Sequence, residues 1–167
     1  MKRLFAGLLI GCLVSPVWAE EADITLEEFL QRLEKIEPWT REKMEAFLGV
    51  KLTKAIPGDR TVYKAYDQFV YAKNLIFREV RLEIDGTTKE TNMFSLWLDN
   101  QSSCFTWEQI KKSYPGGDAV IGSPGAGTTY YKEMPWGVWE FRFDSGRNYR
   151  CVTDVGITTN AWIRKQK

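Results

Sequence analysis

Histidine is absent from the sequence, and its absence removes several common kinds of active site. Serine or cysteine hydrolases that rely on a histidine base cannot be built from this chain, nor can zinc sites with histidine ligands. The three cysteines are too few for a four-thiolate metal site, and no acidic segment has the spacing of a calcium loop. We therefore expect no metal and no other cofactor.

An excess of charge of one sign is also missing. The 23 basic and 22 acidic residues give a formal net charge of +1, which becomes about −1 when Lys2 and Arg3 of the N-terminal leader are set aside. Such a balance offers no electrostatic attraction for nucleic acid or for an anionic membrane surface. We expect neither as a partner.

The N-terminus has the pattern of a secretory signal peptide. A basic start is followed by the apolar run Leu4–Val14 and by Val17–Ala19, which ends in the small-residue pattern of a cleavage site. The apolar run is too short to span a bilayer. We expect cleavage after Ala19, so that residues 1–19 are a signal peptide and 20–167 form one exported, periplasmic domain without a membrane span.

A second interpretation of the leader involves Cys12. The stretch Leu9–Cys12 resembles a bacterial lipobox, in which Cys12 would become a lipidated N-terminus. Apolar residues continue past Cys12 to the ordinary cleavage site, which favours a cleaved signal peptide. Lipidation remains the alternative.

Export changes the meaning of the two cysteines that remain, Cys104 and Cys151. In an oxidising compartment such a pair is more often a disulfide than two free thiols. Closing a loop of this length restricts the unfolded chain by roughly 4 kcal/mol. A nucleophilic cysteine, which is the functional alternative, lacks a histidine base. We therefore predict a disulfide that braces the second half of the chain.

Capping patterns predict three helices. Each begins after a threonine, and the first and third have Glu or Gln three residues later, as in a capping box. The second ends at Gly49, the residue type that most often follows a helix. The predicted helices follow Thr25, Thr40 and Thr106.

Most of the remaining chain has the composition of β-strands, with a hairpin turn at Asp85-Gly86. The fold class is therefore α+β, with the N-terminal helices and one later short helix packed on an antiparallel meander sheet. Two degenerate helix–sheet repeats are an alternative form of this arrangement. The predicted strands are Thr61–Tyr66, Gln68–Lys73, Leu75–Ile84, Met93–Asp99, Thr128–Glu133, Trp136–Asp144 and Asn148–Val155.

A glycine-rich stretch, Pro115–Gly127, predicts a flexible surface loop. Tyr130 and Tyr131 follow it and, as neighbours in a strand, must point to opposite faces. Tyrosine and tryptophan are frequent anchors of protein interfaces. We therefore predict a partner-binding surface made of Tyr130, Tyr131, Trp136 and the loop around Asp118.

Three segments resemble periplasmic helix-plus-meander modules, which include the β-lactamase-inhibitor-like fold and small outer-membrane assembly lipoproteins. They are Thr106–Ile110, Trp139–Gly146 and, as an earlier echo, Thr40–Gly49. The resemblance implies a non-enzymatic binder that uses a sheet face or loops to grip another protein. The chain departs from the assembly lipoproteins because it lacks a clear lipidated cysteine. Exported immunity proteins that block toxins of neighbouring bacteria share this build.

These observations favour a non-catalytic periplasmic protein whose partner is another protein, most concretely an immunity or inhibitor protein acting on an exported toxin or a cell-wall hydrolase. An accessory of envelope assembly, anchored through Cys12, is the first alternative. A carboxylate-dependent envelope hydrolase is the second, although a convergent carboxylate pair is not visible in sequence. Glu79, Glu83 and Asp85 alternate along one strand, and we interpret them as an exposed sheet edge.

Overall fold

A computed structural model describes residues 24–56, 60–65, 69–72, 75–99, 104–122, 127–143 and 151–165. The predicted signal peptide, its cleavage site, Cys12 and the start of the predicted strand Asn148–Val155 lie outside these residues. Within them, no helix is long and apolar enough to cross a membrane.

The described residues form helices and an antiparallel sheet, which confirms the α+β class. The sheet dominates, and every pair of neighbouring strands in it is antiparallel. In chain order the elements are α1 (Leu26–Glu34), α2 (Arg41–Leu48), β1 (Thr53–Ile56), β2 (Arg60–Ala65), β3 (Phe69–Ala72), β4 (Leu75–Asp85), β5 (Thr91–Leu98), α3 (Trp107–Ser113), β6 (Asp118–Ile121), β7 (Thr128–Met134), β8 (Gly137–Phe143), β9 (Val152–Thr159) and α4 (Asn160–Lys165).

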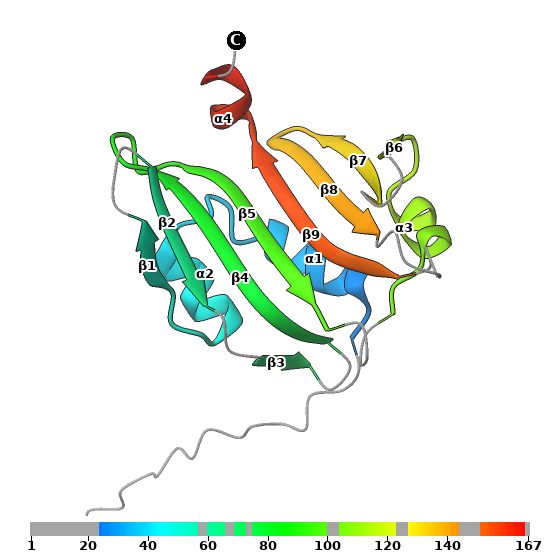
Figure 1. Cartoon of the computed structure of the whole chain (residues 1–167), viewed down its shortest axis with the longest axis horizontal. Coiled ribbons are helices and arrows are strands. Elements are labelled where there is room, and N and C mark those ends of the chain that lie inside the picture. The colour runs from blue at the N-terminus through cyan, green and yellow to red at the C-terminus, as the bar shows by residue number, and fades with distance from the viewer. Residues whose placement is uncertain are drawn as a thin grey trace, which may run out of the picture.

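The strand order shows two meanders that meet in the middle of the sheet. It runs β1-β2-β4-β5-β9-β8-β7-β6, with β3 paired to the side of β4. The first meander therefore starts at one edge and ends at β5, and the second starts at the other edge with β6 and ends at β9 (Figure 1). Each is preceded by a helix, α2 or α3. The pair β5–β9 is the seam between the two halves.

The three predicted helices begin where their capping threonines predict, and α2 ends at the predicted glycine. Thr25 and Thr106 each accept a hydrogen bond from the third helical residue, whose side chain bonds back to the cap. Thr40 caps α2 by accepting a hydrogen bond from the N–H of Lys43, and Gly49 ends this helix with φ of 69°. Local sequence alone therefore fixes these helix boundaries.

One face of the sheet packs against the helices and forms the core. On β5 the alternating residues Phe94, Leu96 and Leu98 are buried, as the sequence predicts. Phe29 of α1 lies 5.2 Å, ring centre to ring centre, from Phe77 of β4. Figure 1 shows α1 and α2 behind the sheet, with the opposite face towards the viewer. We refer to that opposite face as the open face.

The predicted disulfide is present. Cys104 and Cys151 are bonded, with their Cα atoms 4.9 Å apart and a sequence separation of 47. Beside the bridge, the backbone N–H of Val152 donates to the carbonyl of Phe105 at 2.8 Å. The bond therefore ties the residues before α3 to the start of β9. Such a pair indicates an oxidising environment, in agreement with an exported protein.

Several elements differ from the predictions, and among them β9 extends to Thr159, beyond the predicted end at Val155. The stretch predicted as a flexible loop contains the strand β6, because its short run Ala119–Ile121 pairs residue by residue with β7. A four-residue strand among glycines is hidden by the turn signals around it. The strand β1 and the C-terminal helix α4 were not predicted either. The expected sheet edge at Glu79, Glu83 and Asp85 is wrong, because β4 lies inside the sheet between β2 and β5.

Candidate functional site

The outermost strand of the second meander exposes apolar side chains. Val120 is 55% exposed and Ile121 is 81% exposed, and no other large hydrophobic side chain in the described part of the chain is comparably open. Both belong to β6, which among the described strands pairs with β7 alone. Edge strands in natural proteins are usually protected by charge, proline or an irregular ladder. We call residues 118–121 and their surroundings the β6 edge.

A hollow of 430 Å³ lies beside this edge on the helix-facing side of the sheet. It is lined by Trp107, Ala119, Ile121, Thr128 and Phe143. The Trp107 ring forms its wall, because it stands edge-to-face against Phe143 at a centroid distance of 5.0 Å. The Nζ atom of Lys111 lies 5.9 Å from the centre of the same ring. The hollow therefore has an apolar lining with one cation close to it.

The start of the β6 edge is held in a fixed position by a buried tyrosine. The hydroxyl of Tyr130 accepts a hydrogen bond from the Gly117 N–H at 2.8 Å and donates to the Tyr114 carbonyl. A side chain at Gly117 would collide with this arrangement, since a Cβ there would lie 2.3 Å from the Tyr131 carbonyl oxygen. Lys132 adds a bond from its Nζ to the Pro115 carbonyl at 2.6 Å. The link between α3 and β6 is thus tied to β7.

The structure separates the two adjacent tyrosines. Tyr130 is only 3% exposed and faces the helices, so it acts as a support beneath the β6 edge and not as a contact residue. Tyr131 lies on the open face and is half-buried. It pairs directly across the ladder with Asp118, which is exposed. Two of the four predicted contact residues, Asp118 and Tyr131, therefore lie together at the β6 edge.

Trp136 lies elsewhere, in the turn between β7 and β8. Its ring stands edge-to-face between Trp39, at 4.8 Å, and Trp139, at 5.3 Å. Together with Trp39 and residues of the β4–β5 turn it lines a separate hollow of 480 Å³. The half-buried indole is therefore partly committed to packing, and it does not share a surface with Asp118 and Tyr131.

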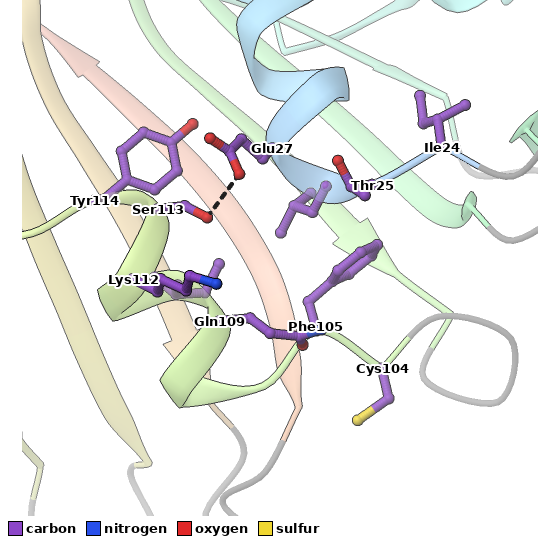
Figure 2. A pocket seen from close by; sticks show the side chains of 11 residues that line it. Ile24, Thr25, Glu27, Cys104, Phe105, Gln109, Lys112, Ser113 and Tyr114 are labelled. Atoms are coloured by element: carbon purple, nitrogen blue, oxygen red, sulfur yellow. Dashed lines mark hydrogen bonds between the residues drawn. The ribbon is translucent and has the colours of Figure 1, made fainter.

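A further hollow, of 560 Å³, separates α1 from α3 (Figure 2). Across it the Ser113 hydroxyl donates to a carboxylate oxygen of Glu27 at 3.0 Å. The lining includes Cys104 of the disulfide. Because the serine and the carboxylate come from different helices, this bond links α1 to α3 at the surface.

The open face carries a carboxyl group whose pKa is strongly raised. Asp154 of β9 is 5% exposed, and its burial raises its pKa to about 6. Arg142 opposes the shift from 3.7 Å, and the charge of Glu140 adds to it. Glu140 is itself engaged, because it contacts Arg142 at 3.4 Å and accepts a bond from Thr158 at 2.7 Å. These groups form a connected cross-strand network.

Sequence reasoning missed the apolar part of the site, namely Trp107, Ala119, Val120, Ile121 and Phe143. The available signal was the uninterrupted apolar run after Asp118, which is unusual inside a glycine-rich segment. The hollow could not be predicted, because it depends on how α3 lies over the β6–β7 ladder. Within the described part of the chain, no three His, Cys, Asp or Glu side chains converge as a metal site would require.

Comparison of the chain with family models, curated proteins and solved structures finds no match in any of the three.

Proposed function

We propose that this chain is a non-catalytic binding protein of the bacterial envelope, and that it neutralises another exported protein by occupying part of its surface. An immunity or inhibitor protein acting on a toxin or a cell-wall-degrading enzyme is the most concrete form. One observation carries the proposal: Val120 and Ile121 are exposed on an edge strand, beside an apolar hollow. Exposed apolar side chains that border an apolar hollow are typical of interaction sites.

The β6 edge is suited to binding because it is rigid before a partner arrives. Tyr130 fixes its first residues, and the disulfide holds the segment before α3 against β9. A surface that is already ordered loses less conformational entropy when it binds. The resemblance to periplasmic helix-plus-meander modules supports the same conclusion, since it implies a binder that grips proteins. The disulfide supports export.

The test is a binding experiment with the mature chain, residues 20–167, against candidate exported toxins and peptidoglycan hydrolases. We expect co-elution with one of them and loss of that protein's activity. Ile121→Lys should weaken binding by at least tenfold, because it places a charge at the centre of an apolar contact. Thr53→Lys, which adds a lysine to the edge strand β1, is the matched control and should bind normally. Equal loss in both variants would refute a role for the β6 edge.

A carboxylate-dependent hydrolase is the alternative, and the raised pKa of Asp154 beside Glu140 is the observation that favours it. A carboxyl group of raised pKa with a second carboxyl group nearby is a common acid–base arrangement. The open face would then act on envelope sugar or peptide. Hydrolysis of peptidoglycan that is lost in Asp154→Asn but kept in Ile121→Lys would establish this function in place of binding at β6.

A further inference from the structure

At the margin of the sheet, β6 carries backbone hydrogen-bonding groups that face away from β7, and no other described strand pairs with them (Figure 1). The Gly122 N–H donates to the Gly127 carbonyl at 2.9 Å, which makes these two residues a bonded pair. Bonded and non-bonded pairs alternate along an antiparallel ladder. Val120 therefore bonds to β7, whereas Ala119 and Ile121 direct their N–H and C=O groups away from it. These four groups face the position that a further strand would occupy.

The side chains of β6 alternate in the same register. Ala119 and Ile121 face the hollow beside Trp107, and Asp118 and Val120 face the opposite way, onto the open face. A strand added next to β6 would place its own side chains in the same two rows. The residue opposite Ala119 would have room for a large side chain, since alanine is small and the hollow lies beside it. The residue opposite Ile121 would have little.

Resting on the protein-binding function above, we propose that the partner inserts an extended segment as an antiparallel strand beside β6. Read from its N-terminus, this segment has the pattern small, apolar, large apolar, basic. The small residue lies opposite Ile121, the apolar residue packs on Val120, and the large one enters the hollow opposite Ala119. Main-chain bonds to an exposed edge supply affinity in this mode, and alternate side chains supply specificity.

Charge decides between a partner segment and a second copy of this chain. Asp118 is exposed and makes no ion pair with any described residue, so it can accept a basic side chain. A second copy, paired about Val120, would match the three apolar positions with its own residues 119–121. It would, however, place Gly122 opposite Asp118. A segment with lysine or arginine at that position is therefore the better occupant.

A labelled peptide, acetyl-Thr-Ala-Val-Leu-Lys-Thr-amide, tests the pattern by fluorescence anisotropy against the disulfide-bonded mature chain. We expect saturable binding. N-methylation of the peptide Ala or Leu should weaken it at least tenfold, because those N–H groups would bond to Ile121 and Ala119. N-methylation of the central Val should change it less than twofold, because that N–H points away. Equal effects at all three positions would overturn strand addition.

Variants of the protein test the same contact from the other side. Ala119→Pro removes an outward N–H without touching the β6–β7 ladder, and it should weaken peptide binding at least tenfold. Ala119→Ser keeps the N–H and is the control, with circular dichroism confirming that both fold. Asp118→Lys should lose the lysine peptide and gain its Lys→Glu counterpart. Failure of this exchange would overturn the basic position of the pattern.

The outcomes separate this inference from the function on which it rests. If an exported protein is captured in an Ile121-dependent manner but the peptide does not bind, strand addition fails and the binding function stands. If the peptide binds as expected but no exported protein is captured or inhibited, strand addition stands and the proposed binding function fails. Analytical ultracentrifugation that shows a dimer abolished by Ala119→Pro would replace the partner segment with a second copy and overturn the proposal.

Discussion

The two edges of the sheet are built in opposite ways. The β1 edge carries Lys54, which is exposed, and the neighbouring Lys51, and its ladder with β2 shifts register between Lys54 and Ile56. The β6 edge carries Ala119, Val120 and Ile121 in regular register with β7. Lysine and an irregular ladder are the usual means by which an edge is kept from pairing with other chains. Only the β1 edge uses them.

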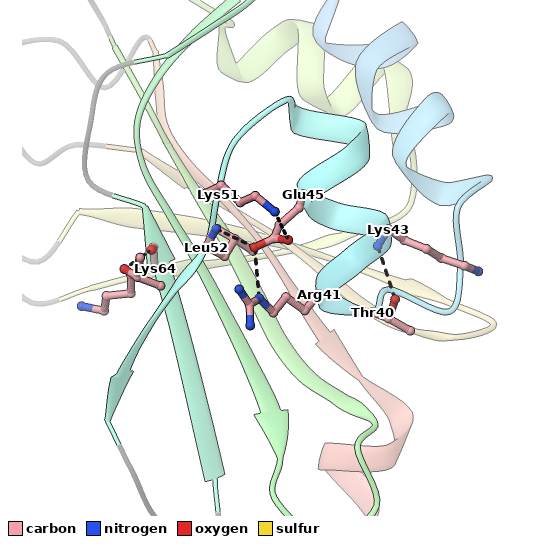
Figure 3. A network of polar contacts seen from close by, with 8 residues as sticks. Thr40, Arg41, Lys43, Glu45, Lys51, Leu52 and Lys64 are labelled. Carbon is pink, nitrogen blue, oxygen red and sulfur yellow. Dashed lines mark hydrogen bonds and ion pairs between the residues drawn. The ribbon is translucent and has the colours of Figure 1, made fainter.

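The β1 edge is also tied to a helix. Glu45 of α2 accepts the Leu52 N–H at 2.9 Å and pairs with Arg41 at 3.0 Å and with Lys51 at 3.6 Å (Figure 3). The hydrogen bond that Glu45 accepts from the Leu52 N–H lowers its pKa most, and the hydrogen bond from Arg41 lowers it further. The chain entering β1 is thus fixed by polar contacts, whereas β6 ends in exposed apolar residues. One edge is therefore protected against pairing with another strand, and the other lacks these protections.

Removal of the disulfide should have the largest effect on this contrast, because the bridge braces only the half that contains β6. Cys104→Ser with Cys151→Ser is expected to lower the free energy of unfolding by about 4 kcal/mol, from the loop that the bridge closes. Urea unfolding followed by tryptophan fluorescence measures it. Amide exchange should rise more in β6 to β9 than in β4. A loss below about 1 kcal/mol would show that the brace is dispensable.

Two glycines allow a matched test of the two halves. Gly117→Ala should cost about 1 to 3 kcal/mol, because its Cβ would meet the Tyr131 carbonyl and the Tyr130 ring. Gly49→Ala, at the end of α2, has open space around it and should cost about 1 kcal/mol from its positive φ alone. Denaturant titration gives both values. Only Gly117→Ala should weaken binding at the β6 edge. If both variants weakened binding equally, the contact between Gly117 and Tyr130 would not be what holds this edge in place.

The seam between the halves contains a titration that can be measured. Burial raises the pKa of Asp154 from 3.8 to about 6, so the folded chain holds this proton more tightly than the unfolded chain. The carboxyl therefore stabilises the fold while it is protonated, and that contribution is lost as the pH rises from about 4 through about 6. Asp154→Asn should raise the free energy of unfolding by about 1 to 2 kcal/mol near pH 7.5.

The same variant should differ little from the parent near pH 4, where Asp154 is protonated in the folded chain. Asp118→Asn, an exposed carboxyl at the β6 edge, is the control and should leave the stability unchanged across this range. Unfolding measured at several pH values would decide the matter. A parent chain that is more stable at pH 7.5 than Asp154→Asn would contradict the sign of the effect.

Exchanging the character of the two edges should have the smallest effect on stability. Ile121→Lys and Lys54→Ile are each expected to change the free energy of unfolding by less than about 0.5 kcal/mol, since both positions are exposed. Their effects on self-association should be opposite. Ile121→Lys adds a protecting charge to the β6 edge, whereas Lys54→Ile removes one from the β1 edge. Light scattering at rising concentration measures this. Identical behaviour of the two variants would show that the edges do not differ.

Sequence reasoning succeeded where a local interaction decides the structure. The capping boxes at Thr25 and Thr106 are complete within four residues, and the alternation of β5 records which face is buried. The adjacency of Tyr130 and Tyr131 also predicts that they point apart. Which of them is buried depends on the pairing of Tyr130 with Phe141 across β7 and β8, and that register is a long-range property.

The candidate site was predicted only in part for the same reason. Asp118 and Tyr131 were identified from residue type, and both lie at the β6 edge. The strand itself was missed, because glycine and proline on both sides outweighed four residues of strand propensity. Trp136 is of a residue type that is frequent in interfaces. Its ring, however, packs against Trp39, a contact between segments far apart in the sequence. Residue type alone could not separate these two uses of a tryptophan.

The position of β9 has a consequence for how the chain is made. It is the last strand in the sequence, yet it fills the middle of the sheet between β5 and β8. A chain that emerges from its N-terminus can form the first meander early, but β5 then has a vacant side until the final strand arrives. The sheet is completed only when nearly the whole chain is free. Truncation shortly before residue 152 should therefore leave the first meander unjoined from the strands β6–β8 and yield no native protein.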